Sequence, residues 1–584
     1  MKKTKMVCTI GPASDSKEVL RELFKKGLNV CRLNFSHGDH AGHQKTIDNI
    51  KEVREELDLP IGIMLDTKGP EVRLGDFKDG PITLEYGDEF TLTTRDILGD
   101  EKIVSQSYKD LPKDVEKGSI ILIDDGLVEL EVVEILNDSD IKCRALNHGE
   151  LSNHKGVNIP NVKLNLPSIT GKDRDDILFG IKNDIEFIAP SFIRKAEDVL
   201  KIRKILEDNG AEDIEIISKI ENQEGIDNID EILDVSDGVM VARGDMGVEI
   251  RTEEIPIVQK TLIRKANERG KSVITATQML DSMIRNPRPT RAEVTDVANA
   301  ILDGTGAIML SGESAAGKYP IKAVETMQNI AIATENSDNY KELFDIKVDK
   351  DHVSTTNAIG RATCTTAAEL HASAIITATS SGHTSKAISK FRPKTPIIAA
   401  TTKKSVMRRL SLTWGVYPVL SPYTDSTDDV IDYSIHSALE KGYVREGDLV
   451  VVTAGVPVGL AGSTNLLKVH TISEILVKGM GVGRGSVVGN VCKIDSEEDL
   501  NKFKEGDIIV AGFTDKYMID CIEKSSALVV EEGGLTSHAA IVGLSLKKPT
   551  IVGARDALKN LEDGELITVD SVTGVVYKGE ARVL

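Results

Sequence analysis

The sequence predicts an α/β protein built around a closed (β/α)₈ barrel, with a small β-barrel domain inserted into it and two further α/β domains after it. Three observations support this fold. Eight short apolar runs alternate with amphipathic helical stretches, short alternating strands with glycine turns interrupt that rhythm once, and a new alternation begins near residue 340. The length of 584 residues suits several domains.

Three strand-and-helix units occupy residues 1–70. The expected strands are 5–10, 29–33 and 61–65, and amphipathic patterns between them predict helices at 16–26 and 41–56. Each strand is followed by polar residues, as expected where parallel strands end at the active face of a barrel.

Residues 71–170 lack helical periodicity and are interpreted as the inserted β domain. Its expected strands are 81–84, 90–94, 119–123, 127–133 and 141–145. The strand-and-helix rhythm returns over residues 171–340. Five more strands, at 185–189, 214–220, 238–242, 272–276 and 307–310, bring the total to the eight that a closed barrel requires.

Two more domains are expected, over residues 341–475 and 476–584. In the first, the loop Thr379-Ser380-Ser381-Gly382-His383-Thr384 joins a strand to a helix, which is typical of a phosphate cradle, although a capped turn without ligand is an alternative. In the last, His538 follows a Gly-Gly turn, and this spacing alone favours a helix-start residue over a nucleophile.

Composition narrows the class of protein. A net charge of −20 argues against nucleic acid or an anionic membrane as a partner. No apolar run reaches the roughly 18 residues of a membrane span, and no signal peptide is visible at the N-terminus, so a cytoplasmic protein is expected. The six cysteines lack metal-binding spacing and are expected to be free thiols.

Charged and polar side chains lie at or just beyond the ends of six of the predicted barrel strands. They are Arg32, Asn34 and Ser36; Asp66 and Thr67; Lys219 and Glu221; Arg243 and Asp245; Thr277; and Ser311 and Glu313. An isolated pair such as Lys219 and Glu221 would favour a simple ion pair at a strand edge. Six such strand ends facing one pocket instead predict a site.

The chemistry of these residues separates into three groups. Two carboxylates suit Mg²⁺, which leaves positions open for substrate oxygens: Glu221 and Asp245. Neutral oxygens around a single carboxylate suit a monovalent cation: Asn34, Ser36, Asp66 and Thr67. Basic side chains remain to neutralise phosphoryl oxygens: Arg32, Arg73 and Lys219.

These motifs resemble those of the pyruvate kinase family. The matching segments are C-R-L-N-F-S-H-G (31–38), L-D-T-K-G-P-E-V-R (65–73), S-K-I-E-N (218–222), A-R-G-D-M-G (242–247), A-T-Q-M-L (276–280), R-P-T-R-A-E-V-T-D-V-A-N-A (288–300) and M-L-S-G-E-S-A (309–315). The resemblance covers roughly residues 1–475. It implies a catalytic barrel, a lid domain, an allosteric regulatory domain, a homotetramer, and transfer of a phosphoryl group from phosphoenolpyruvate to ADP, the last step of glycolysis.

The resemblance also implies residue roles. Lys219 would stabilise the phosphoryl group in transfer, with Thr277 and Arg73 as the other catalytic residues. Substrate would be bound by Arg32, Lys219, Arg243, Gly244, Asp245 and Thr277. The nucleotide would be bound by Arg32, Asn34, His37, Arg73 and Lys195. Mg²⁺ or Mn²⁺ would be held by Glu221 and Asp245, and K⁺ by Asn34, Ser36, Asp66 and Thr67. Glu71 stands where K⁺-requiring members have glutamate, so K⁺ dependence is predicted.

Two departures from the family pattern affect regulation. The loop at 453–459 lacks the Trp and Arg that clamp a second effector phosphate, so a monophosphate such as AMP or a sugar phosphate is the expected activator, bound at Thr379 to Thr384. The tail segment G-G-L-T-S-H-A-A-I-V-G (533–543) resembles the swivelling phosphohistidine domain of phosphoenolpyruvate synthase and pyruvate phosphate dikinase, an addition found in some bacterial pyruvate kinases.

His538 therefore matches a phosphocarrier histidine. No nucleotide-grasp domain that would phosphorylate it is visible, so a structural or regulatory tail is favoured. Two alternatives to an active pyruvate kinase stay open: a dikinase-like phosphotransferase using His538, and a degenerate protein that senses phosphoenolpyruvate or nucleotide. The presence of Lys219, Glu221, Asp245 and Thr277 speaks against the second alternative.

Overall fold

A closed barrel of eight parallel strands, in the order β1-β16-β15-β14-β13-β12-β3-β2, is the centre of the computed structural model, which describes residues 1–338, 340, 354–456 and 464–583. The strands are β1 (Lys5–Thr9), β2 (Val30–Asn34), β3 (Gly62–Asp66), β12 (Phe187–Ala189), β13 (Glu215–Ile220), β14 (Gly238–Ala242), β15 (Ser272–Ala276) and β16 (Ala307–Leu310). The predicted barrel is confirmed, because each expected strand is found to within two residues.

The barrel interior is filled by side chains, as the continuous apolar character of its strands requires. The interior cluster comprises Val7, Val30, Met64, Phe187, Ala189, Ile217, Met240, Ile274, Ala276, Ala307, Met309 and Leu412. All twelve are at most 1% exposed. The barrel is therefore a packed core, and its chemistry lies at the strand ends.

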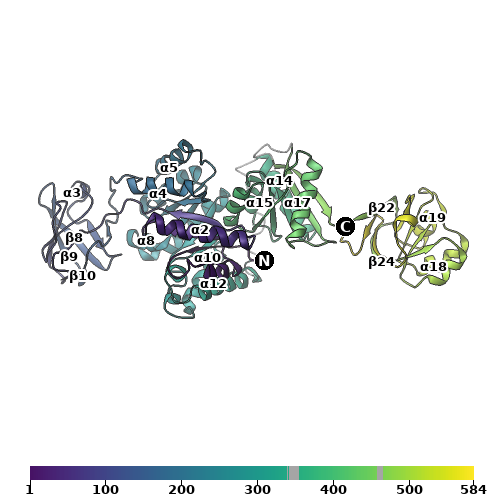
Figure 1. Cartoon of the computed structure of the whole chain (residues 1–584), viewed down its shortest axis with the longest axis horizontal. Coiled ribbons are helices and arrows are strands. Elements are labelled where there is room, and N and C mark those ends of the chain that lie inside the picture. The colour runs from purple at the N-terminus through teal and green to yellow at the C-terminus, as the bar shows by residue number, and fades with distance from the viewer. Residues whose placement is uncertain (339, 341–353, 457–463, 584) are drawn as a thin grey trace. The chain divides into compact units, whose positions relative to one another are not determined.

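Helices surround this barrel, and several are visible in Figure 1. They are α1 (Lys17–Lys25), α2 (His40–Glu56), α4 (Gly171–Lys182), α5 (Ala196–Asp208), α6 (Gln223–Asp227), α7 (Ile229–Val235), α8 (Arg243–Glu249), α9 (Ile255–Glu268), α10 (Arg291–Leu302), α11 (Gly312–Ala315) and α12 (Pro320–Glu335). Helices α4 and α10 begin with capping boxes, Thr170 with Asp173 and Thr290 with Glu293, which satisfy backbone N–H groups of the first turn.

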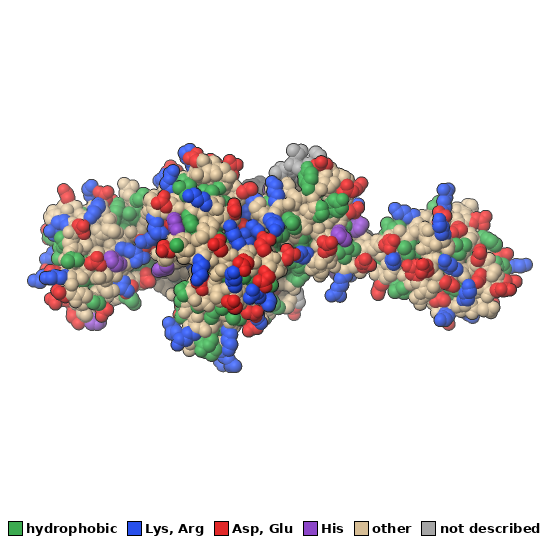
Figure 2. Space-filling view, in the orientation of Figure 1, with side chains coloured by type: hydrophobic (Ala, Val, Ile, Leu, Met, Phe, Trp, Pro, Cys, Tyr) green, Lys and Arg blue, Asp and Glu red, His purple; other side chains and the backbone are tan. Residues whose placement is uncertain are grey.

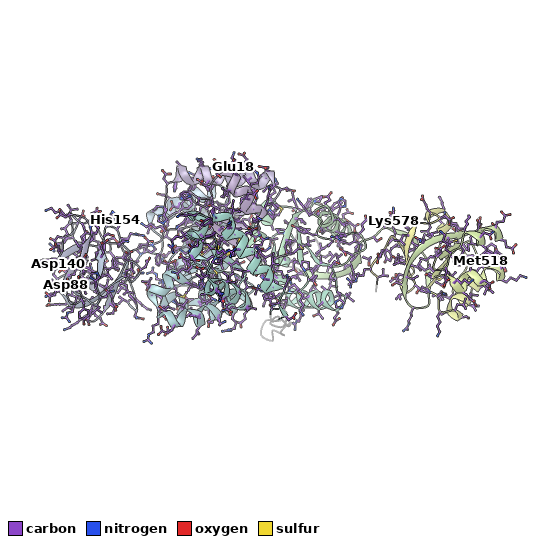
Figure 3. All side chains as sticks on the ribbon, turned by 90° about the horizontal axis from the view of Figure 1, so that it is seen from below. Glu18, Asp88, Asp140, His154, Met518 and Lys578 are labelled. Carbon is purple, nitrogen blue, oxygen red and sulfur yellow. The ribbon has the colours of Figure 1, made fainter. Side chains whose placement is uncertain are left out.

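The inserted domain between β3 and β12 is built almost entirely of strands. Its main sheet has the order β11-β7-β8-β9-β5-β6, and β10 pairs with β4 beside it. The elements are β4 (Ile82–Leu84), β5 (Glu89–Thr93), β6 (Ile103–Ser105), α3 (Leu111–Asp114), β7 (Ile120–Ile123), β8 (Val128–Ile135), β9 (Asp140–Ala145), β10 (Gly149–Leu151) and β11 (Val157–Asn158). Figure 3 labels Asp88, Asp140 and His154 on this domain.

One segment distant in sequence packs with the barrel. The chain divides into two compact units, Met1–Asp345 with Lys404–Pro418, and Ile346–Lys403 with Val419–Leu584. Lys404 Nζ lies 2.8 Å from Glu55 Oε2, Arg408 Nη2 lies 2.6 Å from Glu55 Oε1, and Leu412 belongs to the barrel interior. Simple alternation of strands and helices gives no sign of this packing, because it depends on long-range contacts.

The second unit contains two sheets. The first has the order β19-β18-β17-β20-β21, in which β21 is antiparallel to β20. The elements of this region are α14 (Thr355–Glu369), β17 (Ala374–Ala378), α15 (His383–Ser389), β18 (Ile397–Thr401), α16 (Lys404–Arg409), β19 (Val416–Leu420), α17 (Thr427–Glu440), β20 (Leu449–Gly455) and β21 (Thr464–Thr471). Of these, α16 and the start of β19 belong to the first unit. Residues 457–459 of the predicted effector region lie outside the described residues.

The C-terminal sheet has the order β22-β29-β28-β24-β25-β26-β27-β23. It comprises β22 (Ile475–Lys478), β23 (Met480–Val482), β24 (Ser486–Ile494), β25 (Ile508–Ala511), β26 (Ala527–Val530), β27 (Thr550–Val552), β28 (Leu566–Asp570) and β29 (Val575–Lys578), with helices α18 (Ile519–Lys524), α19 (His538–Ser545) and α20 (Ala557–Asn560). Met518 and Lys578 mark this domain in Figure 3. Strands β22 and β23 occupy a stretch in which no strand was predicted.

Three expectations drawn from composition can be compared with the structure. All six cysteines are free, and five of them are buried. No helix in the described part of the chain has the length and apolar character needed to cross a bilayer. Acidic and basic side chains are mixed over the face shown in Figure 2, which carries no broad basic patch.

Candidate active site

The ammonium group of Lys219 is buried among oxygen acceptors near the carboxyl end of β13. Its Nζ lies 2.9 Å from Glu221 Oε1 and 3.2 Å from Asp66 Oδ1, and it donates to Ser191 Oγ at 2.7 Å. Lys219 and Glu221 face the same way because they are two residues apart on extended backbone. The three N–H groups of the ammonium are thus matched by three acceptors.

Arg32 binds the second oxygen of Asp66. Its Nε donates to Asp66 Oδ2 at 2.6 Å, and its Nη1 donates to Thr9 Oγ1 at 2.7 Å. The adjacent strands β2 and β3 place Asn34 opposite Asp66. Burial acts to raise the pKa of Asp66, but the charges of Arg32 and Lys219 outweigh it, so the net shift is downward and the carboxylate stays ionised.

The turn after β12 completes this cluster. Ser191 Oγ donates to the Thr67 carbonyl at 2.7 Å, and Ser191 N donates to Thr67 Oγ1 at 3.1 Å. The backbone N–H of the next residue, Phe192, donates to Glu221 Oε2. Phe192 has a φ of 57°, a left-handed conformation that costs energy for an aromatic residue and is often found at functional sites.

The two buried carboxylates, Asp66 and Glu221, have pKa values shifted in opposite directions. Burial raises the pKa of Glu221, and Asp245 nearby adds to this rise, while Lys219 opposes it. Burial acts to lower the pKa of Lys219, but Asp66, Glu221 and Asp245 outweigh it and the net shift is upward. The site therefore holds a permanently charged ammonium beside a carboxylate that lacks full charge compensation.

Arg243 connects β14 to the loop that follows β15. It binds both oxygens of Asp296 at 2.7 and 2.8 Å, the carbonyls of Ala276 and Thr277 at 3.2 and 2.7 Å, and Gln259 Oε1 at 3.3 Å. These bonds use all five N–H groups of the guanidinium. The guanidinium therefore holds the Thr277 loop in place, and the substrate contact predicted for the backbone N–H groups near Arg243 stays a prediction.

Thr277 lies at the mouth of the barrel on strained backbone. It has a φ of 68°, and Gln278 beside it has a φ of 53°. Thr277 Oγ1 accepts from Gly244 N at 2.8 Å and donates to the Ala276 carbonyl at 2.6 Å. The first turn of α8, which carries Gly244 and the exposed Asp245, is thereby joined to the Thr277 loop.

A cavity of about 540 Å³ lies between the inserted domain and the barrel. Its walls carry charged side chains from both sides: Arg73, Asp124, Asp125 and Lys155 from the inserted domain, and Asp245 and Glu249 from the barrel. Asn158 Nδ2 of the inserted domain donates to Glu249 Oε1 of the barrel at 2.8 Å. The volume suits a nucleotide-sized ligand.

Five other predicted residues differ in whether they contact the site or line the cavity. Asn34 and Ser36 lie together, since Ser36 N donates to Asn34 Oδ1 at 3.1 Å. Arg73 lines the cavity and donates to Glu71 Oε2 at 2.6 Å. His37 is exposed, and neither it nor Lys195 is among the cavity walls. Lys195 pairs instead with Glu197 at 3.1 Å.

Two predicted sites belong to the second unit. In the Thr379 to Thr384 loop, Gly382 has a φ of 90° and its N–H donates to Thr379 Oγ1 at 2.9 Å. The exposed His538 begins α19, and its Nδ1 lies 2.8 Å from Thr514 Oγ1. The loop is therefore a turn stabilised by its own hydroxyl groups, and His538 is accessible with one ring nitrogen engaged.

Sequence reasoning missed several residues of the site. Ser191 lies two residues beyond a predicted barrel strand, so the rule that found the other polar strand ends could have found it. Lys155 lines the cavity and pairs with Asp124 at 2.7 Å, but it lies in the inserted domain, where no strand-end rule applies. Asp296 and Thr9 act through other side chains and carry no local signal.

Comparisons with known proteins agree with this architecture. Residues 1–324 match the pyruvate kinase barrel domain, residues 357–470 match the pyruvate kinase alpha/beta domain, and residues 503–574 match the mobile domain of PEP-utilising enzymes. A crystal structure of a pyruvate kinase from Cryptosporidium parvum is similar with a TM-score of 0.75 and 42% identity, covering 80% of this chain and 96% of that one.

Curated relatives match over the full length. Pyruvate kinases from Staphylococcus haemolyticus and Bacillus licheniformis are each 53% identical over 586 aligned residues, and one from Geobacillus stearothermophilus is 52% identical over 585. Each alignment covers 100% of this chain and 100% of the relative. With the barrel, its polar strand ends and the C-terminal domain all accounted for, the chain belongs to the pyruvate kinase family of phosphotransferases.

Proposed function

We propose that this pyruvate kinase transfers the phosphoryl group of phosphoenolpyruvate to ADP, giving pyruvate and ATP, with Mg²⁺ or Mn²⁺ and K⁺ as cofactors. The observation that carries the proposal is the buried ammonium of Lys219, held by Asp66, Ser191 and Glu221 at the mouth of the barrel. A fixed, desolvated positive charge is what stabilises a phosphoryl group during transfer.

The basic residues act at different points around that group. Lys219 would donate an N–H to the phosphoryl group in transfer, and Arg32, anchored on Asp66, would bind its oxygens from the β2 side. Arg73 would meet the nucleotide phosphates, since it lines the cavity beneath the inserted domain. Thr277 and the backbone of Gly244 would orient the substrate carboxylate, and the Thr277 hydroxyl would carry the proton to the enolate.

Glu221 and Asp245 fit a divalent cation. Both provide carboxylate oxygens, which Mg²⁺ and Mn²⁺ prefer, and burial raises the pKa of Glu221 even though Lys219 lies beside it. Among the described residues no group of three or more His, Cys, Asp or Glu side chains is placed to hold a metal, so substrate oxygens would complete the shell. When bound, the cation would neutralise charge on the phosphoryl oxygens.

The K⁺ site would use Asn34, Ser36, Asp66 and Thr67. These residues provide neutral oxygens and one carboxylate, a donor set of low charge that suits a monovalent cation. Glu71 supports K⁺ dependence through its position in the motif. In the structure its carboxylate is paired with Arg73.

Regulation would depend on the second unit. The loop Thr379 to Thr384 offers hydroxyl groups and a helix start to the phosphate of an activator, for which a monophosphate such as AMP or a sugar phosphate is the proposed ligand. A homotetramer and a cytoplasmic location also belong to this proposal. Gel filtration with light scattering tests the tetramer.

A dikinase-like phosphotransfer through His538 is the second candidate. It is favoured by one observation: the exposed imidazole is oriented by Thr514 at the start of α19. Incubation with phosphoenolpyruvate would then give a base-stable, acid-labile phosphohistidine that His538→Ala abolishes.

The decisive experiment is steady-state formation of pyruvate from phosphoenolpyruvate and ADP, with Mg²⁺ and with K⁺ or without it. We expect strong activity that falls when K⁺ is omitted, equal turnover in wild type and His538→Ala, and K⁺-independent turnover in Glu71→Lys. Absence of pyruvate formation from the folded wild type under any of these conditions would refute the proposal.

A further inference from the structure

We propose that Ser191 is a positioning residue that couples the monovalent-cation residues to the ammonium of Lys219. The inference rests on the proposed function, because it assigns a further residue to the same reaction. Its basis is geometric: one buried hydroxyl, 3% exposed, bridges Lys219 on β13 and Thr67 at the end of β3.

The hydrogen-bond directions at Ser191 follow from the donors available. Lys219 Nζ can only donate, so Ser191 Oγ accepts from it at 2.7 Å. The single hydroxyl proton must then point elsewhere, and the Thr67 carbonyl at 2.7 Å is better placed than Asp66 Oδ1 at 3.4 Å. The result is a directional chain from Lys219 through Ser191 to Thr67.

Both ends of this chain touch the proposed K⁺ residues. Asp66 accepts directly from Lys219 at 3.2 Å, and Thr67 is reached through Ser191. Thr67 is held a second time, because its Oγ1 accepts from Ser191 N at 3.1 Å. Any change in the placement of Thr67 is therefore transmitted to the ammonium.

Hydrogen bonds and close packing hold the backbone on both sides of Ser191, which limits how far the hydroxyl can move away. Pro190 O accepts from Lys219 N at 3.1 Å, and Phe192 N donates to Glu221. A Cβ atom on Gly69 would lie 2.9 Å from Ser191 Cβ and 2.8 Å from Phe192 Cδ2. This turn therefore packs directly against the backbone that follows Thr67, and it positions both the lysine and the carboxylate of the site.

The coupling has a consequence for phosphoryl transfer. If Glu221 bound a divalent cation through its carboxylate oxygens, the Lys219 N–H that Glu221 accepts would be released to donate to the phosphoryl group. The other two stay anchored on Ser191 and Asp66, which fixes the direction of the released one. Without the Ser191 hydroxyl, Asp66 would be the only group holding the ammonium, and the released N–H would no longer point in one direction.

The test compares Ser191→Ala with a matched control, Ser218→Ala. Ser218 lies beside Lys219 on β13 and is also buried, but its hydroxyl bonds to Ser236 Oγ at 2.7 Å on the other side of the strand. Ser191→Cys is the second variant, since it keeps the side-chain volume near Gly69 with a poor hydrogen-bonding group. Each variant is measured as the full-length chain.

We expect kcat to fall about 10- to 100-fold in Ser191→Ala and Ser191→Cys, as for loss of a hydrogen bond to a charged group. KM for ADP should stay within about twofold, and the K⁺ concentration giving half-maximal activity should rise about tenfold. Independently of activity, the increase of Tm on adding K⁺ should be smaller in both variants than in wild type and Ser218→Ala.

The outcomes separate the inference from the function on which it rests. Wild type and Ser218→Ala without turnover would refute the proposed function. Two results would overturn the inference when wild type and Ser218→Ala turn over normally. One is an unchanged kcat in the Ser191 variants. The other is an unchanged K⁺ response in these variants, measured by turnover and by Tm. A lower Tm without any change in the K⁺ response would make Ser191 a purely structural residue and would also overturn it.

Discussion

Substitution of Lys219 by methionine tests the proposed reaction most directly. The change keeps the aliphatic stem but removes the ammonium, which the structure places 2.9 Å from Glu221 and 3.2 Å from Asp66. Asp66 keeps its bond to Arg32 at 2.6 Å. Glu221 keeps only the Phe192 N–H among these contacts, beside Asp245, so we expect it to bind a proton near neutral pH.

The magnitude combines two losses. Removing a preorganised electrostatic contact to the transferring group costs about 3–4 kcal/mol of transition-state stabilisation, a fall in kcat of about 10²- to 10³-fold. Protonation of Glu221 should in addition raise the Mg²⁺ concentration needed for half-maximal activity. Breaking a buried ion pair costs about 3–5 kcal/mol of stability when the remaining charge stays ionised, and the same protonation should reduce that cost.

The assay couples pyruvate formation to oxidation of NADH at varied Mg²⁺, with circular dichroism to confirm folding. Lys201→Met is the control, because Lys201 Nζ bonds to Ser168 Oγ at 3.0 Å on α5, away from the cluster. We expect Lys201→Met to behave as wild type. Turnover of folded Lys219→Met within tenfold of wild type would refute the role assigned to this lysine.

Two other substitutions probe the barrel. Burial, aided by the charge of Lys2, lowers the pKa of Lys5 to about 7 in the folded protein. Between about pH 7 and 10, Lys5 therefore binds a proton in the unfolded chain but not in the folded one. Because the unfolded chain binds more protons, the free energy of unfolding rises with pH over this range. Lys5→Met should flatten that rise in urea unfolding followed by Trp414 fluorescence; an unchanged slope would contradict the assignment. Asp296→Asn should loosen Arg243 and its loop, lowering kcat about tenfold with an unchanged far-ultraviolet spectrum. Unchanged kcat would show that the pair is not needed to hold the loop.

Much of the candidate site could be found from sequence because it depends on a local rule. Polar residues at or just beyond the carboxyl ends of buried parallel strands face the same end of a barrel, and this rule located Arg32, Asp66, Lys219 and Glu221 before any contact was known. The structure brings these four side chains into one hydrogen-bonded cluster. Their chemical roles stay predictions.

Other features depend on contacts between segments far apart in the chain. The Arg243 guanidinium is fully engaged with Asp296, Gln259 and two carbonyls, while the predicted substrate contact through backbone N–H groups near Arg243 stays a prediction. A side chain's reach and partner are set by which neighbour lies within about 3 Å, and a linear pattern of residue types carries no such information.

The sequence by itself determined the order of the barrel strands, the place of the inserted β domain and the residue types at the strand ends. These follow from short-range causes: β-branched apolar runs form buried strands, glycine turns break helical periodicity, and parallel strands share one polar end. Only the tertiary structure decided that Ser191 joins Lys219 to Thr67, that Leu412 enters the barrel, and that Arg243 holds a loop. Each of these depends on packing between residues more than 25 positions apart, where the closed geometry of the barrel, and not local preference, selects the partner.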